Sequence, residues 1–499
     1  MSQLVESRYY GCRMSVNRRE FVKLSGFALG GLTLSSDLTW ALPQAETTRS
    51  SNGKRIVILG AGMAGLAAGW KLHGAGYSVI ILEAQMHPGG RVHTIREGLS
   101  DDLYAEAGAG RIPRTHTVTL EWIKHFGLEL EPFHPASLAQ VALLKGKRVK
   151  LSTDGSVDMS LVPLDLTPEE RRIGLANLEE HYFGEATKLT GDRIREDWSP
   201  EVFDHLGEIS ASDFLRQKGA SEDAIRYILL GWEDNAAADY IKDVLNHNAE
   251  PLMKIKGGND KLPRAIAAEL SDIIHYGCSV EHIERGDKRT DIAYRRTGML
   301  DHVDADAVIC TIPYTVLRHI AVTPEWSPSK RNVIDNLYYS PAVRTTYQVS
   351  RRYWEDEGLN GFGMSDRNFE VWHPTFGKSG TRGILQAYNY EKYANHLDQL
   401  SENDRIEETI RDMDEVHPNL RRNLETVVIK SWATDPWQRG AYPFYPVGQI
   451  KWYADICKPE GGFWFAGDHA SGLPGWIEGA ITSGLKAAQD VSAKLEAAT

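Results

Sequence analysis

The sequence predicts an α/β fold, in which a parallel sheet with flanking helices is assembled from segments far apart in the chain. The first observation is KRIVILGAGMAGLAAGWKLHGAGYSVIILEA, residues 54–84, where the apolar pattern predicts a strand, a glycine-rich turn, a helix and a second strand. The second is FWFAGDHASGLPGWIEGAITSGLKAA, residues 463–488, which predicts another strand, turn and helix near the C-terminus. Strands predicted over 279–284 and 304–317, the latter ending in a proline turn, lie between them.

The first of these segments has the order expected of a Rossmann-like dinucleotide-binding unit. Gly60 permits the tight turn, Gly62 lets a diphosphate approach the backbone, and Gly65 lets the helix over 63–73 lie close to the sheet. Glu83 follows 18 residues after Gly65, where a carboxylate can accept hydrogen bonds from a ribose. The alternative, a purely structural βαβ unit, does not require this acid.

Two further motifs extend the predicted nucleotide site. In HPGGRVHTI, Arg91 follows two glycines just after the second strand, so its guanidinium suits a second contact with a diphosphate. A solvated loop arginine is the alternative. Near the C-terminus, Asp468 can accept from cofactor hydroxyls, and a helix from about residue 476 directs its positive end toward a flavin carbonyl or phosphate oxygen.

The segments EAQMHPGGRV, GAGRIP, GGNDKLPRA, ADAVICTIP and FAGDHASGLPGWIEGAITSG together resemble the flavin-containing amine oxidase superfamily, and its L-amino acid oxidase branch most closely. The resemblance runs from about residue 54 to the end of the chain. It implies FAD, bound non-covalently because Ala441 stands where monoamine oxidases carry the linking cysteine. The residues it places at FAD are Gly60, Gly62, Met63, Ala64, Gly65, Glu83, Ala84, Gly90, Arg91, Gly108, Ala109, Gly110, Arg111, Val280, Gly467, Asp468, Trp476 and Ile477.

The domain organisation expected from this resemblance has three parts after an N-terminal leader. The leader is a signal peptide and linker over 1–50. An FAD-binding domain comprises 51–95, 250–325 and 430–499; an α+β substrate-binding domain comprises 96–149 and 326–429; and a helical insert covers 150–249. Local patterns agree with the insert: TPEE, residues 167–170, is a helix capping box with proline at the first helical position. An amphipathic helix is predicted over about 403–416 in the substrate-binding part.

Arg111 stands in EAGAGRIPRTHT among glycines and alanines, where little nearby in the sequence offsets its charge. A guanidinium beside an apolar flavin is costly unless it meets an anion, and a carboxylate can bind it through two hydrogen bonds. In L-amino acid oxidases the matching arginine binds the substrate α-carboxylate with the help of a strand tyrosine, here Tyr388. A salt bridge within the fold is the alternative for Arg111, and a half-buried core tyrosine is the alternative for Tyr388.

The resemblance also assigns the walls of the substrate site. The carbonyl of Gly475 would accept a hydrogen bond from the substrate amine, and Trp476 and Tyr442 would be the two rings that flank the reacting carbon. One position departs from the family: Arg344 stands where amine oxidases keep a lysine that holds a water near the flavin. Arginine does not readily deprotonate, so Arg344 is expected either to contact the substrate or to pair with a buried acid.

The function expected from these features is oxidative deamination of L-amino acids to 2-oxo acids, with O2 as the electron acceptor and ammonia and hydrogen peroxide as products. The first alternative is oxidation of primary amines or polyamines without a carboxylate. A flavoprotein with a structural FAD and an NAD-dependent dehydrogenase are further alternatives. His181 and His205 are among 17 histidines, and none stands out as a base. We also expect a homodimer.

Composition narrows the class of protein. The formal net charge of −12 argues against a nucleic-acid partner, and no apolar run is long enough to span a bilayer. Four cysteines lack metal-ligand spacing, so we expect no metal site; a Cys278–Cys310 disulfide is open, but two free thiols are favoured. MSVNRREFVKLSGFALGGLTLSS, from Met14, resembles a twin-arginine signal through Arg18-Arg19, which predicts export to the periplasm or medium of a bacterium; a basic tail is the alternative.

Overall fold

The structure is a computed structural model that describes residues 4–7, 14–17, 53–135, 138–153, 155–190, 205–247, 251–367 and 369–497. Two short strands near the N-terminus, β1 (Leu4–Ser7) and β2 (Met14–Asn17), pair with each other in antiparallel fashion. The predicted twin-arginine pair and the apolar segment after it lie outside the described residues. Within the described ranges, no helix combines the length and the hydrophobicity needed to cross a membrane.

A five-stranded parallel sheet forms the centre of the nucleotide-binding part and confirms the predicted α/β fold. Its order is β12-β4-β3-β16-β25, and each neighbouring pair is parallel. The residues from Ile56 to Leu59 are fully buried, as expected for a strand covered on both faces. The strands are β3 (Arg55–Leu59), β4 (Ser78–Glu83), β12 (Ile274–Tyr276), β16 (Ala307–Cys310) and β25 (Phe463–Phe465).

Helices cover this sheet, and the first helix of the nucleotide-binding part packs against the last helix of the chain. Helix α2 (Met63–Gly74) packs along α17 (Ile477–Ala497), and α10 (Lys261–Glu269) packs against α2. The first turn of α3 (Thr117–His125) is fixed to α17, because the Glu478 carboxylate accepts hydrogen bonds from the backbone N–H groups of Val118 and Thr119. α3 therefore packs on the nucleotide-binding part, although the predicted boundaries place residues 96–149 in the substrate-binding part.

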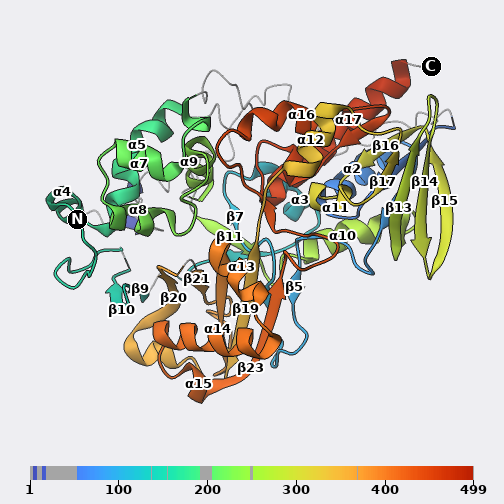
Figure 1. Cartoon of the computed structure of the whole chain (residues 1–499). Coiled ribbons are helices and arrows are strands. Elements are labelled where there is room, and N and C mark those ends of the chain that lie inside the picture. The colour runs from blue at the N-terminus through green and yellow to red at the C-terminus, as the bar shows by residue number, and fades with distance from the viewer. Residues whose placement is uncertain are drawn as a thin grey trace.

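A four-stranded sheet lies beside the parallel sheet, at the edge of the molecule in Figure 1. Its strands are β13 (Cys278–Arg285), β14 (Thr290–Arg296), β15 (Met299–Ala305) and β17 (Ala321–Thr323). The strand predicted over 304–317 ends at Cys310, because α11 (Tyr314–Leu317) begins after Pro313. Cys278 and Cys310 are buried and both are free thiols. Helix α12 (Pro328–Asn336) packs against α16 (Tyr453–Cys457), and α16 contacts β25 of the parallel sheet.

A seven-stranded mixed sheet carries two of the predicted substrate-site residues, Arg344 and Tyr388. Its order is β10-β9-β20-β21-β22-β19-β23, in which only β9 and β20 are parallel neighbours. Every residue of β19 and β22 is buried. The strands are β9 (Ala139–Leu144), β10 (Lys147–Leu151), β19 (Ala342–Val349), β20 (Leu359–Ser365), β21 (Phe369–Trp372), β22 (Gly383–Tyr390) and β23 (Leu424–Ser431).

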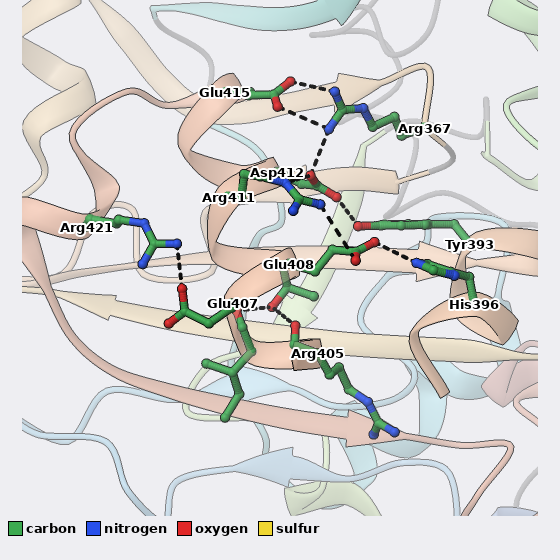
Figure 2. Close-up of polar contacts among 12 residues, drawn as sticks. Arg367, Tyr393, His396, Arg405, Glu407, Glu408, Arg411, Asp412, Glu415 and Arg421 are labelled. Carbon is green, nitrogen blue, oxygen red and sulfur yellow. Dashed lines mark hydrogen bonds and ion pairs between the residues drawn. The ribbon is translucent and has the colours of Figure 1, made fainter. Parts of the chain in front are cut away.

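Helices α13 (Glu391–Gln399), α14 (Glu402–Val416) and α15 (Leu420–Asn423) cover one face of this sheet. Figure 2 shows how polar contacts hold α14: Arg367 donates to Asp412 and Glu415 at 2.7 Å, and His396 lies 2.7 Å from Glu408. Tyr347 on β19 reaches the same face and donates to the Thr409 carbonyl. Since strand side chains alternate, Arg344 points to the opposite face.

The predicted helical insert is a separate group of helices (Figure 1). The predicted capping box is confirmed: the Thr167 hydroxyl accepts from the Glu170 backbone, and the Glu170 carboxylate accepts from the Thr167 backbone. The helices are α4 (Pro168–Ile173), α5 (Leu178–Thr190), α7 (Ala211–Gln217), α8 (Glu222–Leu229) and α9 (Ala237–His247). Short strands connect the parts: β5 (Thr94–Ile95), β6 (Ala105–Glu106), β7 (Ile112–Pro113), β8 (Leu130–Pro132), β11 (Leu252–Ile255), β18 (Tyr339–Ser340) and β24 (Tyr442–Pro443).

Candidate active site

A single cavity of about 570 Å³ connects the nucleotide-binding turn with the seven-stranded sheet and the helical insert. All the predicted site residues line it, from Gly60 and Glu83 at one end to Tyr388 and Tyr442 at the other, except Gly65. Gly65 acts instead through the packing of α2, because a Cβ atom there would lie 1.9 Å from the Gly60 carbonyl oxygen. The histidines His181 and His205 do not line the cavity.

The turn between β3 and α2 has the features of an anion site. Gly62 is the N-cap of α2, and no side chain caps the helix there, so its first N–H groups remain available to a ligand. The Glu83 carboxylate accepts from the Ala61 N–H at 2.7 Å and from the Gln85 N–H at 2.8 Å, which fixes it beside the turn. Burial raises the pKa of Glu83, and these hydrogen bonds oppose the rise.

Arg91 and Asp468, which were predicted as two separate contacts with the cofactor, are bound to each other. Arg91 Nη1 donates to Asp468 Oδ2 at 3.0 Å and to the Ala441 carbonyl at 2.8 Å, while Nη2 donates to Asp468 Oδ1. The same carboxylate accepts from the Gly475 N–H at 3.1 Å. Both residues line the cavity, but their charges are already matched, so any contact of Arg91 with a diphosphate would come from an ion-paired guanidinium.

The predicted aromatic walls lie together. Gly475 has φ of +78°, and an added Cβ would lie 3.3 Å from Tyr442 Cγ, so glycine lets the backbone run directly against this ring. The Tyr442 hydroxyl is hydrogen-bonded to the Tyr388 hydroxyl. The Trp476 ring meets His116 edge-on, with centroids 4.9 Å apart. Tyr442 and Trp476 thus contribute to the same cavity as Tyr388.

The structure corrects the expectation that little offsets the charge of Arg111. Its Nη1 lies 3.3 Å from Glu370 Oε2, and the two side chains are about one-tenth exposed. Trp372 also donates to Glu370 Oε2 at 2.8 Å, and its ring lies 4.9 Å from the Arg111 guanidinium carbon. The alternative of an ion pair within the fold is therefore realised for Arg111, at a position that still lines the cavity.

Arg344 lines the same region of the cavity, and its guanidinium lies close to the rings of Tyr388 and Trp372. Its guanidinium carbon is 3.5 Å from the Tyr388 ring centroid and 3.9 Å from that of Trp372. Nη2 donates to the Gly108 carbonyl at 3.4 Å. Burial lowers the pKa of Arg344 to about 10, so it remains a cation at neutral pH.

Several lining residues were not predicted from the sequence. Glu370 and Trp372 alternate on β21, which places both on one face of the sheet, but nothing near them in the chain indicates that Arg111 lies opposite. Trp232, from the helical insert, stacks on Tyr390 with centroids 4.9 Å apart and on Phe444 at 4.5 Å. Only the aromatic alternation of RGILQAYNY gave a signal for this stack, through Tyr388 and Tyr390.

The chemistry of the cavity lining suits a flavin nucleotide. The uncapped N-terminus of α2 suits a diphosphate, and the fixed Glu83 carboxylate suits a ribose. Gly108, Ala109 and Gly110 line the passage toward Tyr442 without bulky side chains. An added Cβ at Gly108 would lie 1.8 Å from the Arg91 carbonyl, so this strip of backbone is held close to the Arg91 loop.

The profile of the family described as flavin containing amine oxidoreductase matches residues 63–492, which is most of the chain. The chain belongs to this family. Like other flavin-containing amine oxidoreductases, it is an oxidoreductase that uses a flavin cofactor. Members similar to it include the L-amino-acid oxidase of Daboia russelii, 27% identical over 460 residues that cover 89% of this chain and 90% of that protein. YobN of Bacillus subtilis (strain 168) is 30% identical over 466 residues, which cover 89% and 95%.

Solved structures of two amine oxidases share the fold of this flavin-containing amine oxidoreductase. A putrescine oxidase variant superposes with a TM-score of 0.75 at 19% identity, over 88% of this chain and 99% of that one. The cyclohexylamine oxidase of Brevibacterium oxydans IH-35A gives 0.75 at 19% identity, over 89% and 100%. At this identity the likeness establishes the fold alone.

Proposed function

We propose that this flavin amine oxidoreductase oxidises L-amino acids to 2-oxo acids and releases ammonia and hydrogen peroxide. One observation carries the proposal: Arg111, Glu370 and Arg344 line one region of the cavity, and these three side chains have one positive charge in excess. A buried excess charge is costly, and a substrate carboxylate would neutralise it. Relatives named L-amino-acid oxidase support the same conclusion.

The residues of this chain would orient the substrate and leave the redox step to the cofactor. A bound flavin supplies a hydride acceptor that O2 can reoxidise to give peroxide. Tyr442 and Trp476 would confine the α-carbon, and the Gly475 carbonyl would accept a hydrogen bond from the neutral amine. Loss of the Cα hydrogen as hydride and of one proton from nitrogen gives an imino acid, and water then releases the 2-oxo acid and ammonia.

A panel of substrates tests the proposal. The purified yellow protein is supplied in turn with L-amino acids, D-amino acids and simple amines, while peroxide release is followed and the 2-oxo acid is identified by mass spectrometry. We expect peroxide from L-amino acids, with one 2-oxo acid per peroxide. Peroxide from amines alone would reject the requirement for a carboxylate, and no peroxide from any panel would favour a dehydrogenase or a structural flavin.

Oxidation of amines without a carboxylate is the second candidate, and one observation favours it. Trp232, Tyr390, Phe444 and Tyr442 form a continuous aromatic wall of the cavity, which suits a cationic or apolar amine. The matched pair L-phenylalanine and phenethylamine separates the candidates, because the two differ only in the carboxylate. The proposal requires the amino acid to have the higher kcat/KM.

The identity of the cofactor as non-covalent FAD is part of the proposal. The nucleotide-binding turn and the fixed Glu83 favour a dinucleotide over a mononucleotide, and Ala441 offers no thiol for a covalent link. The predicted FAD-binding, substrate-binding and helical domains belong to the same proposal. Acid precipitation should release all the flavin into the supernatant, where chromatography should identify FAD; flavin retained in the pellet would mean a covalent bond.

Export and assembly are separate proposals. Arg18-Arg19 and the apolar segment after them favour transport of the folded holoenzyme by the twin-arginine route, out of the cytoplasm of a bacterium. Replacement of both arginines by lysine should retain the protein in the cytoplasm of the producing cell. The proposed homodimer is checked by light scattering of the purified protein.

A further inference from the structure

Arg344 makes fewer hydrogen bonds than its guanidinium can donate. The side chain is only 5% exposed, and it lines the cavity from β19, which lies between β22 and the edge strand β23. Among the described residues, its Nη1 is buried without any hydrogen-bond partner, and its Nη2 has only the 3.4 Å contact with the Gly108 carbonyl. A guanidinium has five N–H groups and a full charge, so a neutral carbonyl and two ring faces leave most of its bonding capacity unused.

The surroundings of Arg344 hold it in place without neutralising it. Across the sheet, its neighbours on β22 and β23 are Tyr388 and Lys430. Lys430 is a cation bound to Asp435, so it does not offset the charge of Arg344. The rings of Tyr388 and Trp372 fix the plane of the guanidinium and attract its charge weakly. The Glu370 carboxylate also attracts the charge of Arg344, but no described carboxylate is hydrogen-bonded to this guanidinium, which is therefore pre-positioned for a further anion.

Arg111 differs in this respect although it lines the same region. The carboxylate of Glu370, 3.3 Å away, meets its charge. Glu370 also accepts from Trp372, so this carboxylate is committed to two donors. Of the two arginines, it is Arg344 that has no ion pair with a carboxylate in the part of the chain that the structure describes.

We propose that Arg344 is the residue that binds the substrate carboxylate, and that the Arg111–Glu370 pair forms the adjacent polar wall. This inference rests on the proposed function, because it requires a substrate with a carboxylate. It makes Arg344 the residue that determines specificity for amino acids over amines. The unpartnered Nη1 gains an acceptor when the carboxylate binds, and the excess positive charge is neutralised.

Binding of benzoate to the purified oxidised holoenzyme tests Arg344 without turnover. The titration is followed by the change in flavin absorbance, and benzyl alcohol is the matched uncharged probe. Arg344→Met keeps a chain of similar length between the two rings but removes the charge, Arg344→Lys restores a charge, and Arg111→Met is the comparison at the paired arginine. We expect Arg344→Met to weaken benzoate at least 30-fold, Arg344→Lys to recover part of this loss, and Arg111→Met to weaken it less than Arg344→Met does.

Two results would overturn the inference. One is benzoate binding by Arg344→Met that is as tight as in the wild type, and the other is a larger loss in Arg111→Met. If the absorption maximum of the ligand-free flavin shifts in Arg344→Met while benzoate binding stays unchanged, Arg344 serves the flavin instead, and the inference also fails. Flavin content confirms that each variant is folded, and Arg344→Gln replaces Arg344→Met if that variant loses flavin.

The substrate panel keeps the two proposals distinguishable. If the wild type oxidises L-amino acids and benzoate binding does not depend on Arg344, the proposed function stands and the role of Arg344 fails. If the wild type oxidises only amines, the proposed function fails whatever the titration gives. For amino acid turnover, the proposal further expects Arg344→Met to raise KM for L-phenylalanine at least 30-fold while KM for phenethylamine stays level or falls.

Discussion

The guanidinium of Arg91 and the carboxylate of Asp468, 377 positions apart in the chain, are joined by two parallel hydrogen bonds at the middle of the cavity. Asp468 also accepts from the Gly475 N–H, so one carboxylate fixes both the Arg91 loop and the backbone beside Tyr442. The nucleotide-binding part and the predicted substrate-binding walls are thus aligned through a single ion pair.

Replacement of this carboxylate should disturb both parts. Asp468→Asn would leave the partly buried charge of Arg91 without its partner, and we expect a loss of about 3 kcal/mol in the free energy of unfolding together with lower flavin content. Thermal melting and the flavin-to-protein absorbance ratio measure the two effects. Asp490→Asn, at the exposed pair with Lys486, is the control and should leave both unchanged. A normal melting temperature in Asp468→Asn would mean that the pair has no structural role.

Gly65 allows a direct test of helix packing at the nucleotide-binding turn. Gly65→Ala would put a Cβ atom 1.9 Å from the Gly60 carbonyl oxygen, so α2 would have to move away from the sheet. We expect purified protein with little flavin or no soluble protein. Gly74→Ala, in the last turn of the same helix, meets nothing within 4 Å and should be neutral or stabilising by up to about 1 kcal/mol. Full flavin content in Gly65→Ala would contradict the packing argument.

Glu106 should make stability depend on pH. Burial raises its pKa to about 7, against the hydrogen bonds from the Asn259 N–H and the Thr94 hydroxyl. Because the pKa in the folded state exceeds the ordinary value of 4.5, its stabilising contribution is complete below pH 4.5 and is lost as the pH rises to 7.

Glu106→Gln removes this titration and keeps a side chain of the same shape. At pH 8 the variant should be more stable than the wild type by about 3 kcal/mol, and near pH 4.5 this advantage should vanish. Chemical unfolding at several pH values measures the difference. The exposed Glu97→Gln should show no such dependence. An advantage that is independent of pH would mean that the pKa of Glu106 is not raised in the folded state.

Replacement of Glu370 should change benzoate affinity in the direction opposite to that of the arginine variants. Glu370→Gln keeps an acceptor for Trp372 but removes the negative charge beside Arg111, so the cavity would gain positive charge. We expect tighter benzoate binding, by roughly 5- to 30-fold, because a second unmatched cation faces the carboxylate. Benzyl alcohol should bind as before. Weaker benzoate binding would show that Glu370 positions Arg111 for the ligand rather than competing with it.

The parts of the fold that local patterns determine could be predicted from the sequence. The strand predicted at the start of residues 54–84 is found over 55–59, and the helix predicted over 63–73 extends by one residue, because glycines and apolar periodicity mark these limits within a few positions. The predicted helix over 403–416 likewise starts one residue earlier, at Glu402, after its Ser401 cap.

The electrostatics of the site could not be predicted in the same way. Arg111 and Glu370 are 259 positions apart, and they meet only because the register of β21 against β22 places Glu370 opposite Tyr388. No feature near either residue in the sequence determines that register. The sequence therefore indicated Arg111 but not its partner, Glu370. The sequence showed that Arg344 stands where the family keeps a lysine. Only the pairing of strands across the sheet shows which side chains surround it.

The order of strands in the parallel sheet has a consequence for synthesis of the protein. β3 and β4 leave the ribosome early, whereas β25, which completes one edge, and α17, which packs along α2, are translated last. A nascent chain therefore exposes the apolar surface of α2 until translation is nearly finished, and exposed apolar surface of this kind favours aggregation. The cofactor can be enclosed only after release, so shortening the chain before Phe463 should abolish loading entirely rather than weaken it.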